Sequence, residues 1–345
     1  MRVAIVNDMP MAVEALRRVV SGIPDFAVAW VAGNGAEALI KCAEDTPDLL
    51  LMDLVMPVMD GVEATRRIMA RSPCAILIVT ATLEGNSAKV VEALGAGALD
   101  AVQTPAVADS AGLGNENPLK SKMEAAARLI SESCKNEQTS GVIGNGRRSF
   151  RNEHLVVIGA SAGGPSALAS VLKPLPRDFP AAVIIVQHID EQFAPSMASW
   201  LDEQSALQVR VATERDKPQS GTVLVASSND HLVFLDGHTI GYTKEPRDSY
   251  YRPSIDVFFE SVVSHWIGFV TGVLLTGMGR DGAKGLKSLR DSGAMTIAQD
   301  AESCVVYGMP KAAAELGAAA QILPIPAIAQ YLMKSLKRES QRRLA

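Results

Sequence analysis

The chain has 345 residues, which is long enough for two domains that each have their own hydrophobic core. Its 48% hydrophobic and 21% charged residues are typical of a globular protein, and no apolar stretch reaches the length of a membrane span. The net charge of −5 gives no general basic surface, so nucleic-acid binding is disfavoured. The chain starts without the hydrophobic region of a signal peptide and its four cysteines are widely spaced, so we expect a cytoplasmic protein with reduced thiols.

Residues 1–106 alternate short apolar runs with segments of helical spacing. The apolar runs predict strands, and they span residues 3–6, 49–52 and 76–79. The helical patterns span residues 11–20, 61–70 and 88–94. Strands that alternate with helices predict a parallel sheet covered on both faces, which is the doubly wound fold of a flavodoxin-like domain.

The alternation stops over residues 107–153, where Asn, Ser, Gly, Lys and Arg accumulate, and we interpret this stretch as a linker. Within it, residues 119–130 have the spacing of a helix. Alternation resumes over residues 154–335 and predicts a second, Rossmann-like domain. Residues 336–345 form a basic, polar tail that we interpret as a solvated helix end. The expected fold class is therefore α/β, with two doubly wound parallel-sheet domains joined by a linker.

Polar side chains follow the three predicted strands of the first domain. Asp8 follows the first strand, Asp53 follows the second, and Thr80 ends the third. The carboxyl ends of parallel strands meet at one sheet edge, so we expect these side chains to lie close together. Two carboxylates with a further oxygen ligand suit Mg²⁺, which would neutralise a phosphoryl group arriving on one of them. The alternative is that Asp8 and Asp53 are helix caps or loop residues.

The segment Leu51–Gly61, with its Met-Pro and Asp-Gly pieces, resembles the phosphoacceptor segment of two-component receiver domains. The resemblance implies that Asp53 accepts a phosphoryl group from a sensor histidine kinase. It also implies that Asp8, Asp53 and the backbone carbonyl of Val55 bind Mg²⁺, and that Thr80 is the switch residue.

Three positions depart from the receiver pattern. Asn7 stands where the first of two acidic residues is usual, which removes a negative charge beside the metal. Thr104 stands where a lysine is expected before a proline, and a threonine cannot form the ion pair of that lysine with a phosphoryl group. Ala101 replaces the usual aromatic switch residue. We therefore expect the rate and the coupling of phosphorylation to differ from those of a typical receiver.

Three apolar runs of the second domain each lead to a polar residue suited to nucleophilic catalysis. The runs span residues 155–158, 181–186 and 269–275. Ser161 follows the first run within a Gly-x-Ser-x-Gly sequence, His188 follows the second, and Asp281 lies in the segment after the third. In such a set the serine attacks, the histidine takes its proton and the aspartate orients the histidine. The set predicts a hydrolase.

The glycine-rich segment around Ser161 has an alternative interpretation as a phosphate-binding loop. A dinucleotide site predicts an acidic residue at the end of the next strand, but Gln187 and His188 stand there. The chain order Ser, His, Asp also differs from the order Ser, acid, His of the α/β-hydrolases, so that fold is disfavoured.

Five motifs of this domain, in their order along the chain, resemble the catalytic domain of the chemotaxis protein-glutamate methylesterases. They span residues 158–164, 186–188, 252–256, 275–282 and 303–310. The resemblance implies a catalytic triad of Ser161, His188 and Asp281. It assigns oxyanion stabilisation and substrate positioning to Met278, Ala162, Gly163 and Arg252.

The implied reaction is hydrolysis of glutamate γ-methyl esters on chemoreceptor-type signalling proteins, with deamidation of receptor glutamines by the same chemistry. The implied partners are the methylated receptor-type protein and a sensor histidine kinase. Nucleic acid is not a partner, and membrane receptors are reached through protein contacts only. Mg²⁺ would serve receiver phosphorylation, and the ester hydrolysis would need no cofactor.

Residues 7–10 together with Thr104 and Pro105 further resemble the Wsp-type surface-sensing branch of this family. The competing interpretation is a response regulator whose second domain only binds a partner. A DNA-binding output is the third interpretation, but no helix-turn-helix pattern with a basic face follows residue 150.

Overall fold

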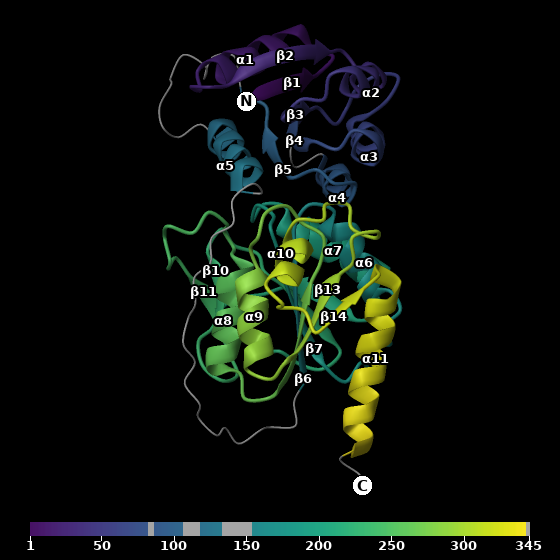
Figure 1. Cartoon of the computed structure of the whole chain (residues 1–345), viewed down its shortest axis with the longest axis vertical. Coiled ribbons are helices and arrows are strands. Elements are labelled where there is room, and N and C mark those ends of the chain that lie inside the picture. The colour runs from purple at the N-terminus through teal and green to yellow at the C-terminus, as the bar shows by residue number, and fades with distance from the viewer. Residues whose placement is uncertain (82–85, 106–117, 133–153, 343–345) are drawn as a thin grey trace. The chain divides into compact units, whose positions relative to one another are not determined.

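The computed structural model describes residues 1–81, 86–105, 118–132 and 154–342. The chain folds into two compact units, one built mainly from Met1–Ser131 and the other mainly from the part of the chain that follows (Figure 1). Much of the expected linker, residues 107–153, lies outside the described residues. No helix in the described parts is long and apolar enough to cross a membrane.

The first unit contains a five-stranded parallel sheet with the strand order β2-β1-β3-β4-β5. Its strands are β1 (Arg2–Val6), β2 (Ala27–Ala32), β3 (Leu49–Met52), β4 (Ala75–Thr80) and β5 (Asp100–Gln103). Its helices are α1 (Pro10–Ser21), α2 (Gly35–Glu44), α3 (Gly61–Arg71), α4 (Ser87–Gly95) and α5 (Pro118–Glu132). This strand order is that of flavodoxin-like domains, so the expected doubly wound fold is confirmed.

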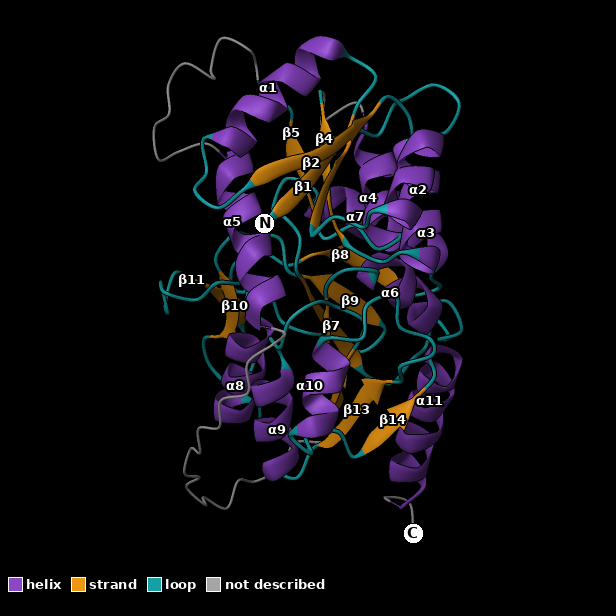
Figure 2. Cartoon of the chain, turned by 45° about the horizontal axis from the view of Figure 1, so that its top comes forward, coloured by secondary structure: helices purple, strands orange, loops and turns teal. Residues whose placement is uncertain are grey.

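The start of α3 explains the Asp-Gly pair of the first domain. All side chains of β3 and β4 are buried, as expected of central strands with helices over both faces (Figure 2). Asp60 caps α3, because its carboxylate accepts a hydrogen bond of 3.0 Å from the N–H of Glu63. At Gly61 a Cβ atom would lie 2.0 Å from the backbone oxygen of Asp53. Glycine therefore allows α3 to begin directly against the loop after β3.

The second unit is built on a seven-stranded sheet with the order β14-β13-β12-β6-β7-β9-β8, in which every pair is parallel. Its strands are β6 (His154–Ala160), β7 (Ala182–Gln187), β8 (Gln208–Val211), β9 (Thr222–Val225), β12 (Phe269–Leu274), β13 (Met295–Gln299) and β14 (Gln321–Leu323). A separate antiparallel pair consists of β10 (His231–Phe234) and β11 (Ile240–Thr243). The helices are α6 (Gly164–Leu172), α7 (Ala194–Gln204), α8 (Ile255–His265), α9 (Ala283–Asp291), α10 (Met309–Glu315) and α11 (Ile325–Arg342).

The stretch 205–250 departs from the expected alternation of strands and helices. Strands β8 to β11 follow one another there without an intervening helix. Local turn chemistry accounts for the β10–β11 part of this stretch. The Asp236 carboxylate accepts hydrogen bonds of 2.7 Å from the N–H groups of both His238 and Thr239, which closes the β10–β11 hairpin. A short turn of this kind favours an antiparallel pair over a helical crossover.

Aromatic side chains join β10 to α8 in the core of the second unit. The rings of Phe234 in β10 and Phe258 in α8 stack with centroids 6.3 Å apart. The Phe234 ring also lies 5.5 Å from the ring of Trp266, which follows the last residue of α8. All three side chains are buried. This packing holds the hairpin in a fixed position relative to α8.

Candidate active site

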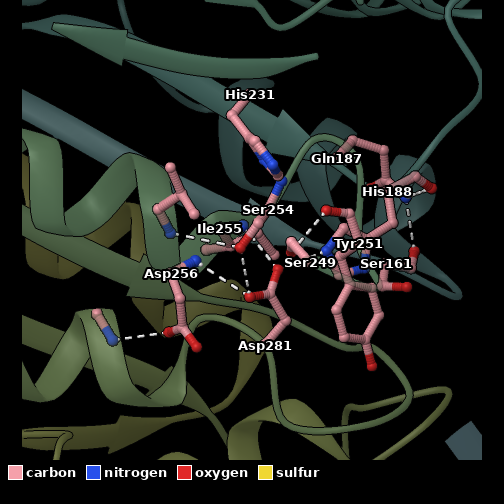
Figure 3. Close-up of polar contacts among 12 residues, drawn as sticks. Ser161, Gln187, His188, His231, Ser249, Tyr251, Ser254, Ile255, Asp256 and Asp281 are labelled. Atoms are coloured by element: carbon pink, nitrogen blue, oxygen red, sulfur yellow. Dashed lines mark hydrogen bonds and ion pairs between the residues drawn. The ribbon is translucent and has the colours of Figure 1, made fainter. Parts of the chain in front are cut away.

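The polar residues after three neighbouring strands meet at one edge of the second sheet (Figure 3). Strand β6 lies between β7 and β12, and its register pairs Ala160 with Gln187. Ser161 and His188 therefore occupy equivalent positions at adjacent strand ends, and the N–H of His188 donates to the carbonyl of Ala160 over 3.0 Å. Asp281 lies in the loop after β12. The structure thus brings together the three residues that the sequence selected as a triad.

The Asp281 carboxylate is buried and accepts four hydrogen bonds. Its Oδ2 lies 2.8 Å from Nε2 of His188 and accepts from the N–H of Ile255 at 2.6 Å. Its Oδ1 accepts from Oγ of Ser254 at 2.8 Å and from the N–H of Asp256 at 3.2 Å. Burial by itself would raise the pKa of Asp281, but His188 and the donors at the start of α8 hold it below its usual value. Asp281 is therefore ionised.

The contact with Asp281 determines which nitrogen of His188 is the base. A carboxylate only accepts hydrogen bonds, so Nε2 carries the proton and Nδ1 carries the lone pair. Nδ1 is buried and has no hydrogen-bond partner among the described residues. The imidazole also stacks on the ring of Tyr251, with centroids 4.3 Å apart and planes 16° from parallel. Nδ1 is therefore the atom that is available to take a proton from Ser161.

Backbone contacts hold Ser161 at the turn between β6 and α6. Its N–H donates to the carbonyl of Thr276 over 3.0 Å, and Nε2 of Gln187 donates to its carbonyl over 2.9 Å. A Cβ atom on Gly277 would lie 2.7 Å from Cβ of Ser161, so glycine leaves room for the serine. The structure describes both Ser161 and His188 and records no hydrogen bond between their side chains. Such contacts in enzymes often tighten only when substrate binds.

The other sequence-predicted residues lie on the loops beside this arrangement. Met278 follows β12, and the described residues include no acceptor for its N–H. Ala162 and Gly163 form the turn before α6. The Arg252 guanidinium donates to the carbonyl of Arg247 over 2.6 Å, within the loop that leads into α8. Arg252 is thus tied to its own loop.

A second carboxyl group, that of Asp256, lies beside Asp281 in the first turn of α8. Its Oδ1 accepts a hydrogen bond of 2.7 Å from the N–H of Gly285. Burial, and after it the negative charge of Asp281, raises the pKa of Asp256 to about 8. Asp256 is therefore neutral at pH 7, and the negative charge of the pair resides on Asp281.

In the first unit, Asp53 and Asp8 lie at the carboxyl ends of β3 and β1. Asp53 is buried, and its two oxygens accept hydrogen bonds from Nδ2 of Asn7 at 3.0 Å and from the N–H of Leu54 at 2.7 Å. Burial raises the pKa of Asp53 and the charge of Asp8 raises it further, while the N–H groups of Leu54 and Val55 only partly oppose this. This edge of the sheet therefore carries negative charge that the protein does not fully compensate.

The oxygens at this edge suit Mg²⁺. Two carboxylates and the backbone carbonyl of Val55 are hard donors, and a divalent cation would offset the burial and the charge of Asp8 that raise the pKa of Asp53. Within the described parts of the chain, no group of three or more His, Cys, Asp or Glu side chains is placed to hold a metal. A metal here would therefore depend on two carboxylates supplemented by backbone and water oxygens.

Thr80, the expected switch residue of the first unit, contacts Asn86 and Thr104. The Thr80 hydroxyl accepts a hydrogen bond of 3.2 Å from the Asn86 amide, and the N–H of Thr104 donates to the carbonyl of Thr80 over 2.9 Å. Lys122 does not replace the missing lysine at position 104. Its ammonium pairs with Asp100 at 2.8 Å, at the opposite end of β5.

Comparison with known proteins agrees with both domains. Residues 156–332 match the family model of CheB methylesterase, and residues 3–110 match that of the response regulator receiver domain. A protein-glutamate methylesterase/protein-glutamine glutaminase of Mesorhizobium japonicum is 53% identical over 345 residues, which covers 99% of this chain and 100% of the relative. The chain belongs to the CheB methylesterase family.

Two further CheB-type relatives support this placement. A protein of Pseudomonas aeruginosa with the same name, numbered 3, is 55% identical over 336 residues, covering 96% of this chain and 98% of the relative. The crystal structure of the CheB methylesterase catalytic domain of Thermotoga maritima is 34% identical with a TM-score of 0.51, covering 54% of this chain and 99% of that domain. This CheB-family chain therefore carries a receiver domain followed by a methylesterase domain.

Sequence reasoning missed the roles of several residues that hold this CheB-type site together. Gln187 and Ser254 lie inside the motifs that were recognised, and the available signal was a polar residue at the end of a strand or before a helix. Tyr251 lies just before one of those motifs. His231 had no local signal, because only the fold of the β10–β11 hairpin brings it to the start of α8.

Proposed function

We propose that this chain is a phosphorylation-regulated protein-glutamate methylesterase, which removes γ-methyl esters from glutamates of chemoreceptor-type signalling proteins. The names of its relatives state this activity, and the chain matches those relatives along nearly its whole length. The observation that carries the proposal is the 2.8 Å contact between Asp281 and Nε2 of His188, because it leaves Nδ1 as the base for Ser161. A serine activated in this way suits acyl transfer from a carboxylic ester.

The reaction would begin when Oγ of Ser161 attacks the ester carbonyl carbon while Nδ1 of His188 takes the hydroxyl proton. Asp281 stabilises the imidazolium that forms. Methanol then leaves with the proton from His188, and a glutamyl ester on Ser161 remains. Water attacks this ester with His188 again as the base. The glutamate carboxylate departs and the hydroxyl of Ser161 is restored.

We assign stabilisation of the oxyanion to the backbone around Met278, Ala162 and Gly163. Tetrahedral intermediates need hydrogen-bond donors at the developing charge. The two loops that carry these residues meet at Ser161, and α6 begins directly afterwards with its positive end toward them. Arg252 shapes the loop before α8 and is assigned to substrate positioning.

Deamidation of receptor glutamines would follow the same course. The side-chain amide would form the same glutamyl ester on Ser161, with ammonia as the leaving group in place of methanol. The second part of the relatives' names, protein-glutamine glutaminase, agrees with this chemistry.

The receiver would regulate this activity by accepting a phosphoryl group on Asp53 from a sensor histidine kinase. Asp8, Asp53 and the carbonyl of Val55 would hold Mg²⁺, whose charge offsets that of the phosphoryl group during the transfer. Thr80 would then donate its hydroxyl to the phosphoryl oxygens. The hydroxyl can do so while it accepts from the Asn86 amide, because a hydroxyl donates one hydrogen bond and accepts others.

Three finer assignments complete the proposal. The receiver spans residues 1–106, the linker 107–153, the methylesterase domain 154–335 and the basic tail 336–345. Helix α5 of this linker belongs to the first compact unit up to Ser131. Asn7 and Thr104 support a place in the Wsp-type surface-sensing branch. The chain reaches membrane receptors through protein contacts and has no nucleic-acid partner, in keeping with its net charge of −5.

Methanol release from membranes that carry methylated receptors tests the proposed function. The full chain should release methanol, and a small-molecule phosphodonor should increase the rate in the wild type but not in Asp53→Asn. A serine-reactive fluorophosphonate provides the test against a partner-binding output domain. Labelling of Ser161 together with methanol release supports the esterase, whereas neither labelling nor release would favour the partner-binding alternative.

A further inference from the structure

His231 is a buried histidine that the triad does not use. It is the first residue of β10 and is fully buried. Its ring points to Ser254 (Figure 3), whose N–H donates to Nδ1 over 3.1 Å. Nε2 lies 3.1 Å from the carbonyl oxygen of Pro246. The ring therefore joins the loop before α8 to the residue that caps this helix.

These two partners determine the tautomer of His231. The N–H of Ser254 can only donate, so Nδ1 is the acceptor. The carbonyl of Pro246 can only accept, so Nε2 carries the proton. The neutral ring thus satisfies one backbone donor and one backbone acceptor in the interior, where an unpaired backbone group is costly.

Ser254 connects His231 to the acid of the triad. Its Oγ donates to Oδ1 of Asp281 over 2.8 Å and accepts from the N–H of Val257 at 3.3 Å as the cap of α8. The next residue, Ile255, donates its N–H to Oδ2 of Asp281 over 2.6 Å. A displaced Ser254 backbone would therefore move two of the donors that hold Asp281.

His231 itself is anchored, because β10 is held against α8. The N–H of Phe234 donates to Oγ of Ser261 in α8 over 3.2 Å, and the Phe234 ring packs on Phe258. The hairpin and the helix thus form one packed body, and the His231 ring bridges them at the end nearest the triad.

We propose that His231 is a positioning residue for the hydrolysis. Its Nδ1 holds the backbone of Ser254, Ser254 holds Asp281, and Asp281 holds His188 through Nε2, which leaves Nδ1 of His188 as the base for Ser161. The proposal rests on the proposed function for the identity of the reaction. The activation of Ser161 can nevertheless be measured without the natural substrate.

Two substitutions separate the two hydrogen bonds of the ring. In His231→Asn the side-chain amide reaches the place of Nδ1, so its oxygen accepts from the Ser254 N–H and the bond to Pro246 is lost. In His231→Gln the amide reaches the place of Nε2, so the bond to Pro246 is kept and the Ser254 N–H has no acceptor. His154→Gln is the matched control, because His154 is also buried but begins β6, at the sheet edge opposite to Ser161.

The main measurement is the rate at which a fluorophosphonate labels Ser161 in the full chain, since this reports activation of the nucleophile. His231→Gln should slow labelling on the order of 10- to 100-fold, while His231→Asn should stay within about threefold of the wild type. With methylated receptors, kcat should fall in the same order and KM should change little. His154→Gln should lower the melting temperature and leave the labelling rate unchanged.

Equal labelling rates in the Gln and Asn variants, both unchanged or both reduced, would overturn the proposal, because the acceptor at Nδ1 would then have no influence. If the wild type is labelled at Ser161 but releases no methanol, the proposed function fails while the labelling comparison still decides the role of His231. Should His231→Gln not fold, Ser254→Ala takes its place. It removes the Oγ bond to Asp281, so slower labelling supports the proposal and an unchanged rate overturns it.

Discussion

Asp281 binds Nε2 of His188 at 2.8 Å, so the imidazole has its lone pair on Nδ1. The donors at the start of α8 take the remaining positions on the carboxylate, since Ser254 and Ile255 donate to its two oxygens. One helix end thus keeps the acid ionised and in place. Neither the separation of these residues in the sequence nor their order relative to the serine affects this geometry.

An Asp281→Asn variant should keep its fold but hydrolyse methyl esters about 10⁴-fold more slowly, the scale known for this change in other triads. The asparagine oxygen would continue to accept from Ser254 and Asp256 in the place of Oδ1. Its amide would take the place of Oδ2 and donate to Nε2 of His188, and the N–H of Ile255 would lose its acceptor. The proton of the imidazole would then move to Nδ1 and block the base. Turnover and melting temperature are measured together. Normal turnover with a lower melting temperature would show that Asp281 is only structural.

Asp256 should make the stability of the methylesterase domain depend on pH. Its pKa is about 8 in the folded chain against an ordinary 3.8, so between these values the folded state binds a proton that the unfolded state lacks. Stability from this group is therefore present at low pH and is lost as the pH rises toward 8.

In Asp256→Asn the amide resembles the neutral carboxyl group of Asp256. This variant should therefore not lose this stability as the pH rises. The variant should melt well above the wild type at about pH 9, because a pKa raised this far costs on the order of several kcal/mol there. About 1 kcal/mol corresponds to roughly 2–4 °C in a domain of this size. The difference should shrink toward about pH 5, below the folded pKa. Scanning calorimetry of both proteins across this range is the measurement, and a pH-independent difference would contradict the assignment.

The sequence allowed the strand ends that carry the triad to be predicted. It did not allow prediction of the residues that hold the triad in place. Ser161 and His188 follow buried apolar runs, and parallel strands bring such positions to one edge whatever their sequence separation. Asp8, Asp53 and Thr80 likewise lie at the carboxyl ends of the adjacent strands β1, β3 and β4. The fold class and the strand ends that carry these residues were therefore predictable.

The β10–β11 hairpin was not predicted, because short strands in the second domain were expected to alternate with helices throughout. His231 consequently had no assigned place, and its contact with Ser254 depends on how the hairpin packs against α8. The hydrogen bonds of Asp281 likewise come from a helix start that is distant in sequence. Tertiary packing, rather than any local pattern, determines these contacts.

In the receiver, Asn7→Asp should strengthen Mg²⁺ binding. Asn7 now donates its amide to Asp53 at 3.0 Å, and an aspartate would replace that donor with a further negative charge beside the metal. The expected gain in affinity is on the order of tenfold, or about 1.4 kcal/mol. Titration calorimetry with Mg²⁺ measures it, with Asp53→Asn as the control that should bind weakly and accept no phosphoryl group. Equal affinity in the wild type and Asn7→Asp would contradict the metal argument.

Val58 should carry backbone strain in the loop after the phosphoacceptor. Its φ is 69°, and the N–H of Met59 donates to the carbonyl of Pro57 over 2.8 Å, which describes a tight γ-turn. A β-branched side chain in this region costs about 1–2 kcal/mol, so Val58→Gly should stabilise the receiver by about 1 kcal/mol. Val55→Gly, in the same loop and also exposed, lacks the positive φ and should give no stabilisation in urea unfolding. If Val58→Gly unfolds at lower urea concentration than the wild type, Val58 does not carry this strain.

The most direct test of the account is methanol release from methylated receptor membranes by the wild type and by Ser161→Ala. Ser161 is buried at a turn held by the carbonyl of Thr276 and by Gln187, and both contacts involve its backbone, so the variant should fold as the wild type does. The wild type should release methanol and Ser161→Ala should release almost none, because no other group can form the glutamyl ester. Release by Ser161→Ala at a rate near that of the wild type would contradict it.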